Sequence, residues 1–140
     1  MNQFWEQEAT ALVEQIRSAF RLAVKSERLT DRLLELRLTP LSGESTPIAL
    51  VISADQVIFS AGDGTRFELP PLPDSTSELV RLVKGVAHGG LTETMQRGRV
   101  SFELRLDDGI VLTGASSRLS SPSGTGGRRV IHYEGYCDSQ

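Results

Sequence analysis

The strongest constraint on the fold lies in the last third of the chain, where apolar and polar residues alternate on both sides of a short turn. Every second residue of 100–106 is apolar, and the turn-forming residues 107–109 lead into a second apolar-rich run at 110–113. Alternation with a period of two is typical of a strand that buries one face. The sequence therefore predicts an antiparallel β-hairpin in this region.

The hydrophobic pattern also selects the register of this hairpin. A three-residue loop with Gly109 in the left-handed conformation sets Leu104 opposite Leu112 and Phe102 opposite Gly114. A two-residue loop would set apolar residues opposite polar ones, because a shift of one residue moves every side chain to the other face. We therefore expect the three-residue loop.

Residues 31–69 carry a second group of strand patterns. The segment 34–38 alternates leucine with charged residues, so its leucines should face the core. The segment 48–52 is apolar at every position, which indicates a strand covered on both faces. Shorter strand-like segments at 57–59 and 66–69 flank a glycine-rich turn. Together these segments predict an antiparallel meander.

Two helices are expected outside these strands. Residues 1–27 place apolar side chains three and four positions apart, which is the spacing of one long amphipathic helix. The residues with this spacing are Trp5, Ala9, Leu12, Val13, Ile16, Phe20, Ala23 and Val24. After a proline-rich connector at 70–73, Ser75 and Glu78 have the spacing of a capping box at the start of a second helix, residues 74–89, which glycines then end.

These elements predict a single α+β domain over residues 1–140. Its parts are a long helix (1–27), the meander (31–69), the second helix (74–89) and a hairpin plus final strand (99–136). We expect both helices to pack on one face of a twisted antiparallel sheet of about six to seven strands. Because the helices would cover only one face, a strand that is apolar on both sides favours a homodimer.

Composition and charge narrow the class of protein. With 39% hydrophobic and 24% charged residues the chain lies in the ordinary globular range, and 18 acidic against 15 basic residues give a net charge of −3. A mildly acidic chain is unlike a dedicated nucleic-acid binder, which is usually basic. A single cysteine, Cys137, and the lack of a signal-peptide pattern or a membrane-length apolar run favour the cytoplasm and no membrane contact.

Few residues are suited to catalysis, and the candidates are His88, His132 and Glu134. His88 follows the second helix, where the helix dipole favours a protonated imidazole. His132 and Glu134 stand two apart on one strand face, as a base and the group that orients it would. A solvated strand face explains that pair equally well. The sequence contains no metal-ligand spacing and no cofactor-binding pattern, so we expect no cofactor and no metal.

The clearest electrostatic asymmetry is an arginine-rich stretch near the C-terminus. Between residues 97 and 129, six arginines stand against three acidic residues. The arginines that we expect to bind a partner are Arg97, Arg99, Arg105, Arg128 and Arg129. Such a cluster fits an acidic protein partner. It would also fit phosphate or single-stranded nucleic acid, although the aromatic residues needed for base stacking are sparse.

The predicted order of helix, sheet, helix and sheet resembles that of type III secretion chaperones and of some bacterial immunity proteins, in topology and not in any motif. Those proteins are small, acidic and often dimeric. The resemblance implies a bacterial cytoplasmic module that acts through a protein partner, and by self-association, without catalysis. One alternative is a small-molecule-binding protein or cofactor-free enzyme with a cavity between helices and sheet. The other is binding of nucleic acid or phosphate by the arginine-rich region.

Overall fold

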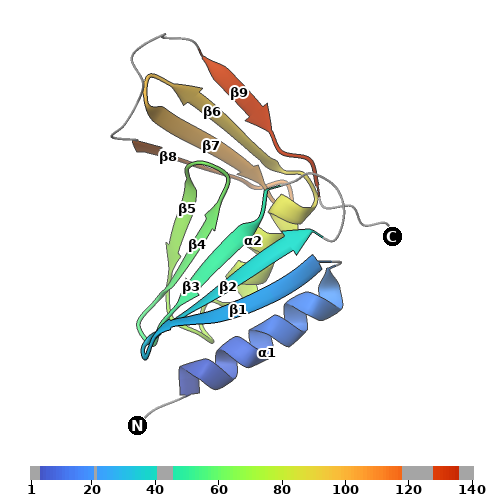
Figure 1. Ribbon diagram of the computed structural model, residues 1–140. Helices are drawn as coiled ribbons and strands as arrows, with labels where there is room; N and C mark the ends of the chain where they lie inside the picture. Colours follow the sequence, from blue (N-terminus) through green and yellow to red (C-terminus); the bar gives the residue numbers. More distant parts are fainter. Residues whose placement is uncertain (1–3, 21, 41–45, 118–127, 136–140) are drawn as a thin grey trace.

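The computed structural model describes residues 4–20, 22–40, 46–117 and 128–135, and it shows an α+β fold with two helices and two antiparallel sheets (Figure 1). The expected α+β class is confirmed. The expectation of one sheet with both strand groups in it is wrong, because a five-stranded and a four-stranded sheet take its place. Strand pairing between distant segments cannot be read from local alternation, so the number of sheets was the least constrained part of the expected fold.

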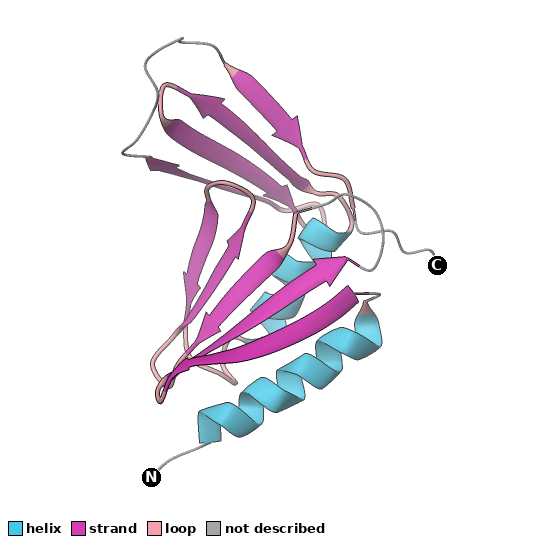
Figure 2. Ribbon diagram, in the orientation of Figure 1, coloured by secondary structure: helices cyan, strands magenta, loops and turns pink. Residues whose placement is uncertain are grey.

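The larger sheet is a meander, since its strands lie side by side in chain order. Its strands are β1 (Leu22–Thr30), β2 (Leu33–Pro40), β3 (Ile48–Ile52), β4 (Val57–Ala61) and β5 (Thr65–Leu69). The smaller sheet has the order β8-β7-β6-β9. Its strands are β6 (Leu91–Gln96), β7 (Arg99–Arg105), β8 (Val111–Ser117) and β9 (Arg129–His132). The helices are α1 (Phe4–Ala19) and α2 (Thr76–Ala87). In Figure 2, α1 lies along β1, at the end of the molecule away from the smaller sheet.

The expectation of one long N-terminal helix is wrong beyond Ala19. The helix α1 ends there, and residues 22–30 form the edge strand β1. In β1 the buried Leu22 and the half-buried Val24 belong to the core, whereas Ala23 between them is exposed. The helical spacing is misleading here because a short apolar run can match both periods. Pairing with β2 along the length of β1 decides in favour of the strand.

The meander predicted for residues 31–69 is confirmed, with β1 added to its edge. Leu36 and Leu38 of β2 are fully buried, as the alternation predicts. The turn between β4 and β5 falls at the predicted glycine-rich segment, and Gly62 has a φ of 61° there. Local alternation and turn residues were therefore sufficient to predict this part of the larger sheet.

Within one chain, β3 is covered fully on one face only, and the cover expected for its other face stays a prediction. Its core-facing residues are fully buried, whereas Ala49 and Val51 are half-buried on the other face. Arg37 and Glu35 of β2 lie opposite these two residues and pair with each other at 3.7 Å. Their aliphatic stems can cover part of this face. The homodimer that would cover the rest of this face stays a prediction.

The smaller sheet contains a strand, β6, that the sequence pattern does not predict. Its residues Leu91 and Glu93 are both fully buried. A carboxylate thus occupies a position where alternation would need an apolar residue. The strand β9 pairs antiparallel with β6 and ends at His132, so within the described residues it is shorter than the expected final strand; Tyr136 lies outside the described residues.

The hairpin of β7 and β8 has the predicted register. Leu104 lies opposite Leu112, and the pairs on either side follow the same register. Gly109 has a φ of 88° in the turn, and its N–H donates to the Leu106 carbonyl at 3.0 Å. The three-residue loop and the left-handed glycine are therefore confirmed.

The helix α2 lies within its predicted bounds of 74–89. A glycine C-cap ends it as predicted, since the Gly90 N–H donates to the Gly85 carbonyl at 2.8 Å. The capping box does not form, because Ser75 makes no side-chain cap hydrogen bond and Glu78 pairs with an arginine one turn along α2 instead. The position of the helix start was predictable, but its hydrogen bonds were not.

One contiguous hydrophobic core contains side chains from both helices and from both sheets. Leu12 of α1 and Leu79 of α2 are fully buried in it, together with Phe59 of β4 and Leu104 of β7. The outward-facing Ile58 of β4 is not part of this core. Both helices therefore share a core with the same face of the larger sheet, and the smaller sheet closes that core with its inner residues.

Candidate binding face on the smaller sheet

The side chains of the smaller sheet alternate between the core and an outward surface, which we call the outer face. Inward residues such as Leu91 and Leu104 are fully buried. The outward residues are mainly polar and charged: Thr92, Thr94, Gln96, Arg99, Ser101, Glu103, Arg105, Val111, Thr113, Ala115, Val130 and His132. The outer face is therefore polar, and it is not covered by either helix (Figure 1).

Open grooves cross this outer face. The first has a volume of about 630 Å³ and is lined by Thr92, Thr94, Arg99, Ser101, Phe102, Glu103, Thr113, Gly114, Ala115, Arg128 and Val130. A second, of about 500 Å³, shares three of these residues and adds Gln96 and Arg97. The shared residues are Thr94, Arg99 and Ser101. We call the joined surface the arginine groove, because Arg97, Arg99 and Arg128 all line it.

The three arginines of the arginine groove are exposed, and no described residue pairs with them. Within the described part of the chain, Arg97, Arg99 and Arg128 form no ion pair and no side-chain hydrogen bond. By contrast, Arg37 and Arg66 on the larger sheet each pair with a glutamate of their own strand. The guanidinium groups of the groove are therefore available to an incoming anionic group.

A tight turn places two of these arginines. Arg97 and Gly98 connect β6 to β7 with φ values of 53° and 77°, so both have the left-handed conformation of a two-residue hairpin turn. A residue other than glycine costs about 1 kcal/mol in that conformation. The turn sets Arg99 opposite Gln96 at the start of β7. The chain therefore accepts a locally unfavourable residue at the mouth of the groove.

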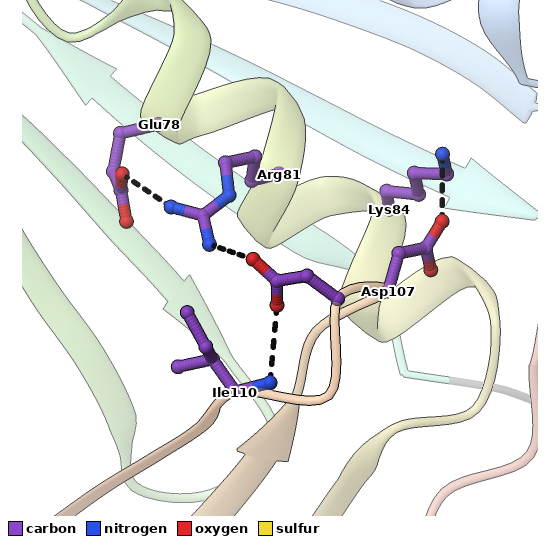
Figure 3. Close-up of polar contacts among 6 residues, drawn as sticks. Glu78, Arg81, Lys84, Asp107 and Ile110 are labelled. Atoms are coloured by element: carbon purple, nitrogen blue, oxygen red, sulfur yellow. Dashed lines mark hydrogen bonds and ion pairs between the residues drawn. The ribbon is translucent and has the colours of Figure 1, made fainter.

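Two of the three acidic residues in the arginine-rich stretch of the sequence pair with α2 (Figure 3). Asp108 pairs with Arg81 at 2.9 Å, and Asp107 pairs with Lys84 at 2.6 Å. The hydrogen bond from Lys84 lowers the pKa of Asp107. Neither of these carboxylates lines the arginine groove, and Glu103 is the one acidic side chain among the described residues that do.

Arg105 and Arg129 do not line the arginine groove. Arg105 projects from the same outer face, but it lines a smaller pocket of about 70 Å³ near the end of α2, which shares Thr92 and Glu103 with the groove. Arg129 lies opposite Met95 in the ladder of β6 and β9, so its side chain leaves the sheet on the side opposite to that of Arg128. The structure therefore brings together three of the five arginines that the sequence predicts as binding residues.

The three candidate catalytic residues have different neighbours. His88 Nδ1 lies 3.4 Å from Asp107 Oδ1 at the end of α2. His132 Nδ1 lies 2.9 Å from Thr92 Oγ1 on the outer face. Glu134 is exposed beyond the end of β9. Among the residues that the structure describes, no group of His, Cys, Asp or Glu side chains is arranged to hold a metal ion.

The sequence pattern does not single out Glu93, whose fully buried carboxylate joins the two sheets. Its Oε1 accepts hydrogen bonds from the Asp63 N–H at 2.9 Å and the Tyr133 hydroxyl at 2.8 Å. Its Oε2 accepts hydrogen bonds from the Gly64 N–H at 3.0 Å and the Thr65 hydroxyl at 2.5 Å. We call these five residues the Glu93 junction. The threonines that flank Glu93 in β6, which favour strands, are the one sequence signal that points to it.

The hydrogen bonds of the Glu93 junction keep its carboxylate charged. Burial raises the pKa of Glu93, but the bonds from Thr65, Asp63, Gly64 and Tyr133 outweigh burial and leave that pKa below its ordinary value. Burial and the bond to this carboxylate raise the pKa of Tyr133, so the phenol keeps the proton that it donates. All four donors serve one buried acceptor, which makes the junction a structural tie between the sheets.

Comparison with protein-family models, with curated proteins and with solved structures finds no match to this chain. Its function is therefore inferred from its own residues. In the described ranges, neither helix has the length and apolar character needed to cross a membrane.

Proposed function

We propose that this chain is a non-enzymatic interaction module that binds an acidic segment of a partner protein in the arginine groove. Its main support is that Arg97, Arg99 and Arg128 line one continuous open surface and have no carboxylate partner within the described residues. Guanidinium groups bind carboxylates with charge-assisted hydrogen bonds. The hydroxyls of Thr94 and Ser101 add further polar contacts at the same surface.

Because the arginine groove is open to solvent, salt and long-range attraction should both affect the binding of a partner. Because its arginines are exposed, salt screens their attraction for a partner over about 8 to 10 Å at ordinary ionic strength. Charges at an exposed rim act more on the association rate than on the lifetime of the complex. We therefore expect fast association and an affinity that falls clearly as salt is added.

The contacts of the candidate catalytic residues favour binding over catalysis. A cavity enzyme would need His88, His132 and Glu134 around one enclosed pocket. The pocket that His132 lines has a volume of about 70 Å³, and neither of the other two residues lines it. The region between the helices and the larger sheet is occupied by the contiguous core.

Phosphate or nucleic acid is the second candidate ligand, because guanidinium and hydroxyl groups also bind phosphate oxygens. Nucleic-acid platforms add exposed aromatic rings on which bases stack. Among the described residues that line the arginine groove, Phe102 is the only aromatic one, and it is buried. This difference favours an acidic protein segment.

The order of helix, sheet, helix and sheet is the one observed. We therefore retain a chaperone-like or immunity-like role in the bacterial cytoplasm as part of this proposal. We also retain self-association, for which the half-buried Ala49, Val51 and Ile58 on the outward side of the larger sheet offer a small apolar surface. Sedimentation velocity tests self-association directly, and a strict monomer at high concentration would remove it.

A double charge reversal tests the arginine groove. The probe is an acetylated, amidated and fluorescein-labelled hexapeptide of alternating glutamate and valine, and its binding is followed by fluorescence anisotropy. Arg99→Glu with Arg128→Glu should weaken binding at least about tenfold, since two attractive charges become repulsive. The matched control is Lys25→Glu with Arg32→Glu, two exposed residues of the larger sheet and its first hairpin turn, which changes the net charge equally. Equal losses in both double variants would contradict the proposal.

A further inference from the structure

β9 is an edge strand, because β6 is its only partner among the described strands. Its exposed residues include Arg129, Val130 and His132, and the side chain of Val130 is 55% exposed. A free strand edge presents backbone N–H and C=O groups that can pair with another strand. The free edge of β9 is therefore a possible docking line beside the arginine groove.

The pairing with β6 determines which backbone groups of β9 are free. The Tyr133 N–H donates to the Leu91 carbonyl at 3.0 Å, in the register that continues through β9. Hydrogen-bonded and non-hydrogen-bonded pairs alternate along an antiparallel ladder. Val130 and His132 therefore occupy non-hydrogen-bonded pairs, and their N–H and C=O groups point away from β6.

The same residues project their side chains onto the outer face. Val130 and His132 lie opposite Thr94 and Thr92 in the ladder, and Val130 lines the arginine groove together with Arg128. In an antiparallel pair, residues directly opposite each other have side chains on the same face. A strand added along β9 would therefore place every second side chain on the outer face, next to Arg128.

Charge decides between a second copy of the chain and a partner strand. Residues 128–132 contain two arginines, a histidine and no acidic residue. Antiparallel pairing of two copies of residues 128–132 would bring four arginines into one two-stranded ribbon, where like charges repel. A strand with carboxylates at alternate positions would instead meet the guanidinium of Arg128 on the outer face.

We propose that β9 accepts an extended acidic segment of the partner protein as an additional antiparallel strand, with its carboxylates on the outer face beside Arg128. This inference rests on the proposed function and adds to it the mode of binding, which is main-chain pairing. Antiparallel pairing also determines which amides of the added strand form hydrogen bonds with β9. The residues of the added strand that send side chains to the outer face are the residues whose N–H groups bond to Val130 and His132.

Backbone N-methylation of the peptide tests the pairing with the unmodified full chain. The alternating glutamate and valine peptide is compared with one version N-methylated at the glutamates and one N-methylated at the valines. Methylation at the glutamates should weaken binding at least about tenfold, and methylation at the valines should change it less than about twofold. If both methylated peptides bind like the parent, strand addition is wrong while the arginine groove stands. If methylation at the valines weakened binding and methylation at the glutamates did not, the antiparallel arrangement would be wrong.

A pair of protein variants tests the same contact from the other side. Val130→Pro removes an N–H that points to the free edge, which an edge strand tolerates, and it should weaken peptide binding at least about tenfold. Val130→Thr keeps that N–H and should bind within about threefold of the parent protein. Hydrogen exchange of the Val130 and His132 amides should slow when the peptide is added to the unmodified chain. Unchanged exchange at both amides would overturn the inference, whether or not the proline variant folds.

If no binding of the glutamate and valine peptide is seen, the proposed function itself fails. A lysine and valine peptide serves as the charge control, and binding of it with equal affinity would overturn the acidic partner. A single-stranded oligonucleotide that binds more tightly, with no effect of Val130→Pro, would assign the surface to nucleic acid instead.

Discussion

The Glu93 junction and the arginine groove lie on opposite faces of the same strand, β6, and they use charge in opposite ways. Glu93 points inward, is fully buried and accepts four hydrogen bonds. On the outer face Thr94 lies among Arg97, Arg99 and Arg128, which are exposed and unpaired within the described residues. The charge on the inner face of β6 therefore joins the sheets, whereas the arginines around its outer face are available to a partner.

The contrast follows from the cost of removing each group. Replacing a buried carboxylate leaves several donors without an acceptor, and each such donor lowers the free energy of unfolding by about 1 to 3 kcal/mol. An exposed arginine without a partner contributes little to stability, and its replacement changes the free energy of unfolding by about 0.5 kcal/mol or less. Stability and binding should therefore be separable by mutation on the two faces of one strand.

The largest effect is expected for Glu93→Ala. The N–H groups of Asp63 and Gly64 and the hydroxyls of Thr65 and Tyr133 would lose their acceptor, so the free energy of unfolding should fall by about 3 to 5 kcal/mol. Chemical denaturation measures this loss. Glu93→Gln keeps the shape and one acceptor oxygen and should lose about half as much. A loss below about 1 kcal/mol for the alanine variant would contradict the role of the junction.

The ionisation of Glu93 should also appear in the pH dependence of the free energy of unfolding. Because the pKa of Glu93 is lowered in the folded chain, its contribution is present above its unfolded value near 4.5 and is lost as the pH falls through the folded pKa. The raised pKa of Tyr133 gives the opposite sign, so its contribution is complete below its unfolded value of 10.0 and is lost as the pH rises above it. Denaturation midpoints between pH 2 and 11 measure both changes. In Glu93→Gln the acid step assigned to Glu93 should be absent.

A smaller effect is expected at the β7–β8 turn, away from both sites. Gly109→Val places a β-branched residue in the left-handed conformation and should cost about 1 to 2 kcal/mol in unfolding free energy. No heavy atom lies near the position of an added Cβ, so the loss would come from the backbone and not from a clash. Peptide binding at the arginine groove should be unchanged. The hydrogen bond from the Ile110 N–H to Asp108 also stabilises this turn. An unaltered denaturation midpoint would mean that the turn tolerates valine in the left-handed conformation.

The smallest effect is expected at Arg97, and it should have opposite signs for stability and binding. Arg97 has a φ of 53°, a conformation in which asparagine is favoured over arginine. Arg97→Asn should therefore raise the free energy of unfolding by about 0.5 kcal/mol while it weakens binding of the acidic peptide about twofold to threefold. If the variant binds as the parent does, Arg97 is not part of the binding surface.

The sequence predicts features that depend on local alternation and fails where a contact between distant segments decides. The hairpin register followed from the pairing of Leu104 with Leu112, and the glycine C-cap of α2 followed from its glycines. The strand β1 could not be separated from α1 by periodicity, because its pairing with β2 decides its conformation. The strand β6 was not predicted because its central inward residue, Glu93, is polar. The groups that donate hydrogen bonds to Glu93 lie 28 to 40 positions away in the chain.

The candidate site was partly predictable for the same reason. Charge counting finds the arginines, since it needs no structure. It cannot tell that Arg99 and Arg128 line one groove whereas Arg105 and Arg129 do not. That division depends on strand pairing, because Arg129 points to the other face and Arg105 lies on the outer face at the opposite end of β7 from Arg99. The pairing of Asp107 with Lys84 also depends on the packing of α2 against the hairpin turn.

The measurement that tests the central contrast most directly is an NMR titration of the isotope-labelled chain with the glutamate and valine peptide. Amide shifts should change at Thr94, Arg97, Arg99, Ser101 and Val130, on the outer face and free edge of the smaller sheet, and should stay constant at Asp63 and Gly64 in the Glu93 junction. Shift changes concentrated around His88 and Asp107, or spread equally over both faces of β6, would contradict the division of β6 into a structural face and a binding face.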